Sequence, residues 1–88
     1  MIREVDSGAI SLESYTIDST KSKVFFVTIA NSDSSYSTLC FDYRAIKAGF
    51  GSQLIPGTEY CVNASIGNNA VTFTTEASYK IVHVGSYY

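Results

Sequence analysis

The stretch QLIPGTEYCV, residues 53–62, places a proline and a glycine between two apolar runs. Proline fixes φ near about −65° and glycine tolerates a positive φ, so Pro56-Gly57 predicts a sharp turn. The apolar residues on either side recur with the period of two that is typical of β-strands. The stretch therefore predicts a corner at which the chain passes from one sheet of a β-sandwich to the other.

Alternating apolar residues predict further strands on both sides of this corner. Both faces of residues 23–30 are apolar, which predicts a central strand. In residues 9–18 the alternation slips phase, which indicates a bulge or a strand that changes sheets. The other predicted strands are 38–44, 59–66, 70–76 and 78–84. The residues expected to face the core are Phe25, Val27, Ile29, Leu39, Phe41, Tyr43, Tyr60, Val62, Ala64, Ile66, Val71, Phe73 and Thr75.

Three connections between these runs have turn signals of their own. Residues 67–70, GNNA, contain a glycine and two asparagines that tolerate positive φ, so they predict a tight hairpin between two strands. Residues 31–37, NSDSSYS, form a polar turn cluster. Residues 45–53, AIKAGFGSQ, predict either one helical turn stopped by Gly49 or an irregular link.

The length of 88 residues, with 45% apolar residues, suits a single domain with one core. We therefore expect an all-β fold, a small antiparallel β-sandwich that spans residues 1–88. Residues 1–8 are expected to form an N-terminal arm, and residues 78–88 an extra C-terminal strand and tail.

Charge and hydropathy exclude two classes of partner. The net charge is −2 and the six basic residues are scattered, whereas a nucleic-acid-binding protein needs clustered Lys and Arg. No apolar run approaches the roughly 20 residues of a membrane span, so we expect no membrane insertion. Residues 1–14 carry charges where a signal peptide has its apolar region, so we expect no signal peptide.

The pattern Leu54-x-Pro56-Gly57-x-x-Tyr60 resembles the E–F corner of fibronectin type III domains. The resemblance implies that the Tyr60 ring is buried and that its hydroxyl bonds to the backbone of residues 54–58. It also implies that Leu54 anchors the turn and that residues 60–66 and 70–76 are strands F and G.

Two departures shorten the expected fold. The tryptophan typical of strand B is absent, so Phe25 or Phe26 takes its place. Only nine residues separate Arg44 from Leu54, where the family usually fits two more strands. We therefore expect a shortened fibronectin-III-like or immunoglobulin-like sandwich of about six to seven strands.

The two cysteines, Cys40 and Cys61, are out of phase with the inward residues of their strands. In the C–F sheet that the resemblance implies, these strands are neighbours, so we expect the two side chains to lie close together on one face. Two interpretations stay open, a cross-strand disulfide and two unpaired thiols. Two cysteines and one distant histidine do not have metal-ligand spacing, so we expect no metal site and no cofactor.

No catalytic constellation is predicted, and we expect that the protein is not an enzyme. His83, the only histidine, is either a general base or a solvent-facing strand residue, and no motif places a nucleophile beside it. The carboxylates do not pair at a useful spacing and are interpreted as turn residues or solvated positions; they are Asp18, Asp33, Asp42 and Glu59.

Four tyrosines lie among serines and glycines in predicted loops or near the C-terminus: Tyr36, Tyr79, Tyr87 and Tyr88. This composition is typical of adaptable binding surfaces, and it is equally consistent with a solubilising surface and terminal packing.

The predicted terminal strand has apolar residues on both faces, Tyr79 and Ile81 on one, Val82 and Val84 on the other. A lone edge strand should not show this, so we expect Tyr79–Val84, with Tyr87 and Tyr88, to pack against another chain.

Function follows from this expected interface. We expect a non-enzymatic structural module that acts by assembly, through a protein partner or self-association. A small phage virion protein, decorating the capsid or associated with the tail, is one setting for it. The alternative is a fibronectin-III-like binding or adhesion module of a larger extracellular protein. The expected location is therefore the virion or the extracellular space.

Overall fold

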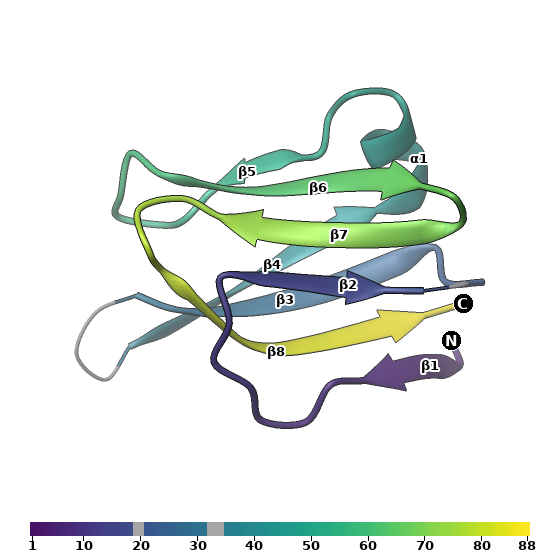
Figure 1. The fold of residues 1–88 in the computed structure, drawn as a ribbon, viewed down its shortest axis with the longest axis horizontal. Coiled ribbons are helices and arrows are strands. Elements are labelled where there is room, and N and C mark those ends of the chain that lie inside the picture. The colour runs from purple at the N-terminus through teal and green to yellow at the C-terminus, as the bar shows by residue number, and fades with distance from the viewer. Residues whose placement is uncertain (19–20, 32–34) are drawn as a thin grey trace.

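A computed structural model describes residues 1–18, 21–31 and 35–88, and it shows two antiparallel four-stranded sheets packed face to face (Figure 1). Sheet A has the strand order β1-β8-β3-β4, and sheet B has the order β2-β7-β6-β5. The elements are β1 (Arg3–Asp6), β2 (Ser14–Ile17), β3 (Val24–Ala30), β4 (Tyr36–Asp42), α1 (Tyr43–Lys47), β5 (Ser52–Leu54), β6 (Cys61–Gly67), β7 (Ala70–Thr75) and β8 (Lys80–Tyr87). The predicted all-β sandwich is confirmed, with eight strands in place of six to seven.

The core lies between the two sheets and consists of the inward residues of each strand. In β3, Phe25, Val27 and Ile29 are fully buried, as the alternation predicted. The ring of Phe73, from the facing strand β7, lies with its centroid 5.5 Å from that of Phe25 and 5.4 Å from that of Phe41. The three rings therefore join the two sheets at the centre of the core. Of the residues expected to face this core, Tyr60 is the one that the structure leaves exposed.

Strand β8 lies in the middle of sheet A, between β1 and β3. In the register with β3, Thr28 faces His83 and Ile29 faces Ile81, so Val82 is an extra residue in a β-bulge. Because of this bulge, Ile81 and Val84 both point into the core, and both are fully buried there. The apolar residues on both predicted faces thus reflect a bulge in a central strand.

The expectation that Tyr79–Val84 packs against another chain is accordingly wrong. The neighbours of this segment are strands of its own sheet. Of the six residues expected at an interface, Tyr79, Ile81, Val82, Val84 and Tyr87 are buried or half-buried within the chain, and Tyr88 is exposed.

The N-terminal segment is also part of the sandwich, so the expectation of an arm at residues 1–8 is wrong. Strand β1 pairs with β8, with a bulge at Glu4. Leu12 then forms an isolated bridge with Ile81 in sheet A, whereas β2 pairs with β7 in sheet B. The phase slip in residues 9–18 therefore marks a segment that changes sheets, one of the two predicted alternatives.

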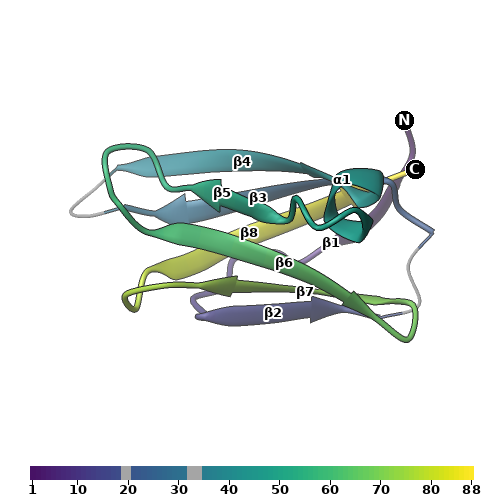
Figure 2. The same cartoon turned by 90° about the horizontal axis from the view of Figure 1, so that it is seen from above.

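Two predicted connections are confirmed. The hairpin between β6 and β7 turns at Asn68 and Asn69, which have φ of 50° and 62°. The helical turn is α1, which Asp42 caps by accepting the N–H of Ala45 at 3.2 Å, and Gly49 follows it with φ of 95°. Figure 2 shows that α1 carries the chain from β4 in sheet A to β5 in sheet B.

Candidate functional site

The Pro56-Gly57 turn joins β5 and β6, which are neighbours in one sheet, so the predicted corner between sheets is wrong. Thr58 donates its N–H to the carbonyl of Ile55 at 3.0 Å, and Gly57 has φ of 79°, as in a type II turn. The buried anchor is Ile55, because Leu54 is 59% exposed on the outer face of β5. The turn therefore closes a hairpin.

Tyr60 does not form the implied tyrosine corner. Its side chain is 38% exposed and its ring packs against Tyr79, with 5.9 Å between the centroids. The hydroxyl that holds the turn belongs to Thr58. It donates to the carbonyls of Ile55, at 2.8 Å, and Tyr60, at 3.2 Å, and it accepts the Tyr60 N–H at 3.1 Å. A threonine three residues after Ile55 thus replaces the tyrosine hydroxyl.

We expect Thr58→Val to lower the free energy of unfolding by about 1–2 kcal/mol, because the Tyr60 N–H loses its acceptor and the carbonyls of Ile55 and Tyr60 keep only their backbone donors. Tyr60→Phe should change it by less than about 0.5 kcal/mol, since the ring is partly exposed and keeps its contact with Tyr79. Urea denaturation of both variants measures the difference. A larger loss of unfolding free energy for Tyr60→Phe than for Thr58→Val would indicate that the Tyr60 hydroxyl holds the turn after all.

The cysteines lie on different sheets, Cys40 on β4 of sheet A and Cys61 on β6 of sheet B. Both are free thiols. The predicted C–F pairing of residues 38–44 with 60–66 is therefore wrong, and so is the expected proximity of the two side chains. The strand next to β4 is β3, with which it pairs antiparallel.

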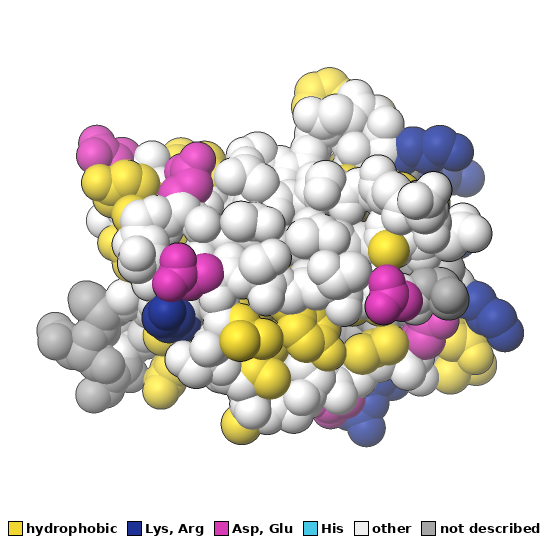
Figure 3. Space-filling view, viewed as in Figure 1, with side chains coloured by type: hydrophobic (Ala, Val, Ile, Leu, Met, Phe, Trp, Pro, Cys, Tyr) yellow, Lys and Arg dark blue, Asp and Glu magenta, His cyan; other side chains and the backbone are white. Residues whose placement is uncertain are grey.

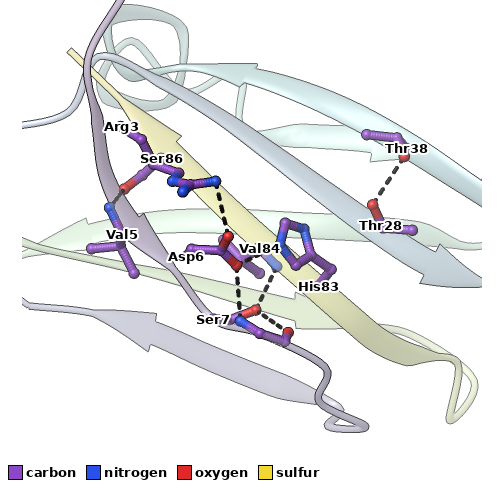
Figure 4. Close-up of polar contacts among 10 residues, drawn as sticks. Arg3, Val5, Asp6, Ser7, Thr28, Thr38, His83, Val84 and Ser86 are labelled. Atoms are coloured by element: carbon purple, nitrogen blue, oxygen red, sulfur yellow. Dashed lines mark hydrogen bonds and ion pairs between the residues drawn. The ribbon is translucent and has the colours of Figure 1, made fainter.

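His83 lies beside a carboxylate that the sequence did not place near it. Its Nε2 is 2.7 Å from Asp6 Oδ1, and Arg3 forms an ion pair with the other oxygen at 3.0 Å (Figure 4). The N–H of Gly8, and then the ring of His83, hold the pKa of the Asp6 carboxyl below its ordinary value. The contact joins residues 77 positions apart, so local spacing contained no signal for it. It attaches β1 to β8.

Asp6, Ser7 and His83 are not arranged as the nucleophile, base and acid of an acyl-transfer enzyme. The hydroxyl of Ser7, just after β1, accepts the N–H of Val84 in β8 at 2.8 Å and donates to the carbonyl of Gly8 at 2.8 Å (Figure 4). No pocket opens beside it in the part of the chain that the structure describes. The contacts of His83 with Asp6 and of Ser7 with Val84 join β8 to the N-terminal segment.

The other predicted residues are dispersed. Asp42 caps α1, Asp18 and Glu59 are exposed, and Asp33 lies outside the described residues. Tyr87 packs edge-on against Phe26 with 5.5 Å between the centroids. Across residues 1–18, 21–31 and 35–88, no three His, Cys, Asp or Glu side chains form a potential metal site. Over the same ranges, no helix has the length and apolar content to span a membrane.

The outer face of sheet B is polar and carries no acid or base. Figure 3 shows it over β2, β7 and β6, with charged side chains toward its margins. Hydroxyls pair across the strands, for example Thr16 with Thr72 at 2.9 Å. A face of small hydroxyl groups that bond to one another is typical of a solvated surface.

The four sheet edges differ in how well they are protected against pairing with another strand. Edge β1 has a bulge and three charged residues among its four, both of which discourage pairing. Edges β2 and β5 are short, with four and three residues. Edge β4 has seven residues in unbroken register with β3, and within YSTLCFD it has no lysine and no proline. By these criteria β4 is the least protected edge.

The backbone of β4 presents hydrogen-bonding groups along this edge. Tyr43 donates its N–H to the carbonyl of Lys23 at 2.8 Å, so this pair belongs to the bonded set of the β3–β4 ladder. Bonded and non-bonded positions alternate in an antiparallel ladder. The N–H and C=O groups of Tyr36, Thr38 and Cys40 therefore point away from β3, and the described residues supply no strand on that side of β4.

Three large apolar side chains are exposed on β4, on β5 and on the link before β5. Tyr36 on β4 is 64% exposed and Leu54 on β5 is 59% exposed. Phe50, in the link between α1 and β5, is 74% exposed. The side chain of Gln53 donates to the carbonyl of Cys40, which ties β5 to β4 across the gap between the sheets. The outward backbone groups of β4, together with the exposed Tyr36 side chain on its outer face, are the candidate site.

Comparison with protein-family models, with curated proteins and with solved structures finds no match.

Proposed function

We propose that this protein is a non-enzymatic structural module that assembles by adding a strand to β4. The observation that carries the proposal is the open edge of β4, which is long and regular and has no bulge, lysine or proline. A strand that pairs there bonds the outward N–H and C=O groups of Tyr36 and Thr38 and the N–H of Cys40, and it takes the place of the Gln53 side chain at the Cys40 carbonyl.

An exposed side chain on this edge supplies apolar area that a strand pair alone does not have. A stable interface buries about 1,000 Å² or more in total. Tyr36, on β4 itself, is 64% exposed. Its burial would add hydrophobic stabilisation to the backbone hydrogen bonds.

An assembling module of this size fits a repetitive structure, and a small phage virion protein, in capsid decoration or at the tail, is the setting we propose. The alternative is a fibronectin-III-like adhesion module, in which β4 would pair with a strand of a different protein. Under this alternative the protein stays monomeric on its own.

Replacement of Thr38 by proline tests the role of β4. The Thr38 N–H points away from β3, so Thr38→Pro removes a donor for an added strand while it keeps every ladder bond within the chain. We expect the wild type to associate as its concentration rises and Thr38→Pro to stay at the monomer mass of 9.6 kDa. Sedimentation equilibrium over a concentration series measures both.

Thr16→Pro is the matched control. Thr16 is also an exposed threonine on an edge strand, and Thr75 donating to the carbonyl of Glu13 shows that the Thr16 N–H points away from β7. Each threonine loses one cross-strand hydroxyl contact of 2.9 Å, so the local costs are alike. Thr16→Pro should associate as the wild type does. A wild type that is monomeric at every concentration, or equal association of both variants, would overturn the proposal.

A further inference from the structure

Three residues of β4 direct their backbone groups to the open edge, Tyr36, Thr38 and Cys40. The Cys40 carbonyl accepts the Gln53 side chain, which a strand paired along the whole edge displaces. Asp42 follows them, but its carbonyl belongs to the start of α1 and its side chain accepts the N–H of Ala45. A partner strand that uses all three residues therefore needs three matching residues of its own, spaced two apart. β4 itself has this set.

We propose that the strand added to β4 is β4 of a second copy, antiparallel, with the two-fold axis at Thr38. This inference rests on the proposed function and names its partner. In this register Thr38 faces Thr38 of the second copy, and Tyr36 faces Cys40 of the second copy. The two A sheets then form one continuous eight-stranded sheet with an isologous interface.

The charges of β4 permit this pairing of like with like. Asp42 is the one charged residue in Tyr36–Asp42. It lies four residues from the axis, so the two Asp42 positions are roughly 27 Å apart along the strands. The facing positions nearest the axis are uncharged, and a thiol beside a tyrosine ring is a favourable contact. Within Tyr36–Asp42, self-pairing therefore brings no like charges together.

Cross-linking between cysteines tests the register. Facing residues in a bonded antiparallel pair have Cα atoms about 5.5 Å apart, within the range that a disulfide spans. In a Cys40→Ser, Cys61→Ser background, Thr38→Cys should form covalent dimers under copper-phenanthroline on the order of tenfold faster than Thr16→Cys, because assembly raises the effective thiol concentration toward the millimolar range.

Strand direction is tested with the native Cys40 in a Cys61→Ser background. Antiparallel pairing separates the two Cys40 positions by about 13 Å along the strand, so Cys40 alone should cross-link slowly. Adding Tyr36→Cys places a new thiol opposite Cys40 and should raise the rate on the order of tenfold. Rapid Cys40–Cys40 dimers would indicate a parallel or shifted pairing and would overturn the inference.

The two proposals fail in different ways. If Thr38→Pro abolishes association but Thr38→Cys cross-links no faster than Thr16→Cys, the edge functions with another partner or register, and only this inference falls. If the wild type never associates, the proposed function falls with it. Fast cross-linking at Thr38 together with slow cross-linking at Cys40 supports both.

Discussion

Phe73→Ala is expected to lower the free energy of unfolding by about 3–5 kcal/mol. The Phe73 side chain is fully buried and its ring contacts those of Phe25 and Phe41, so the truncation leaves a cavity where the two sheets meet. For a domain of this size that loss is a large part of a total stability on the order of 5–10 kcal/mol. Denaturation should show a much lower midpoint temperature and urea concentration than the wild type, or a chain that is already unfolded at about 37 °C.

Phe50→Ala is the control for this variant. It removes the same ring from a side chain that is 74% exposed, so it should change the stability of the monomer by no more than about 0.5 kcal/mol. Both variants are measured at a low protein concentration, where association does not contribute. Equal stability of Phe73→Ala and Phe50→Ala would contradict the placement of the core.

Glu4→Ala is expected to cost about 2–3 kcal/mol, the second-largest effect. The bulge in β1 turns the Glu4 carboxylate toward the segment before β3. There it accepts the N–H of Lys21 at 2.8 Å, the N–H of Ser22 at 3.0 Å and the Ser22 hydroxyl at 2.5 Å. Ser22 is buried, so removal of the carboxylate leaves buried donors without their acceptor.

Glu59→Ala separates this effect from the loss of any one negative charge, because Glu59 is exposed in the β5–β6 turn. We expect a change of less than about 0.5 kcal/mol for Glu59→Ala. Denaturation midpoints in urea, read by tyrosine fluorescence, measure both variants. If they lose equal stability, Glu4 does not hold the segment before β3.

Local patterns in the sequence predicted the elements well. The alternation in Val24–Ala30 identified both the strand and its buried face, because side chains alternate sides along a pleated strand. The two asparagines of the GNNA turn predicted the β6–β7 hairpin from backbone conformation alone. The slip in residues 9–18 indicated either a bulge or a change of sheet, and the structure has the change of sheet.

Features that depend on distant residues could not be predicted in this way. Strand β8 is central because β1, at the other end of the chain, pairs with it. Without knowledge of that pairing, the segment that contains Ile81 and Val84 looks like an unprotected edge strand. The bulge at Val82 also cannot be recognised in the sequence, so the alternation places Ile81 and Val84 on opposite faces although both point into the core. The cysteine pairing failed for the same reason, since it assumed a strand order that the chain does not adopt.

The turn at Pro56-Gly57 was predicted, but its anchor was not. Leu54 and Ile55 are both apolar and adjacent, so the sequence alone leaves open which of them points inward. The structure buries Ile55 and exposes Leu54. The candidate site at β4 had no local signal either, because a strand becomes an edge only through the order of the strands around it.

Hydrogen exchange of single amides tests the central claim most directly. The amides of Tyr36, Thr38 and Cys40 face the open edge, so they should exchange rapidly in dilute protein and become protected as the concentration rises. The amides of Ser14 and Thr16, on the edge of β2, should exchange at a rate independent of concentration. Protection of the β4 amides alone is the predicted result. Exchange at β4 that is as fast in concentrated as in dilute protein would contradict assembly through this edge.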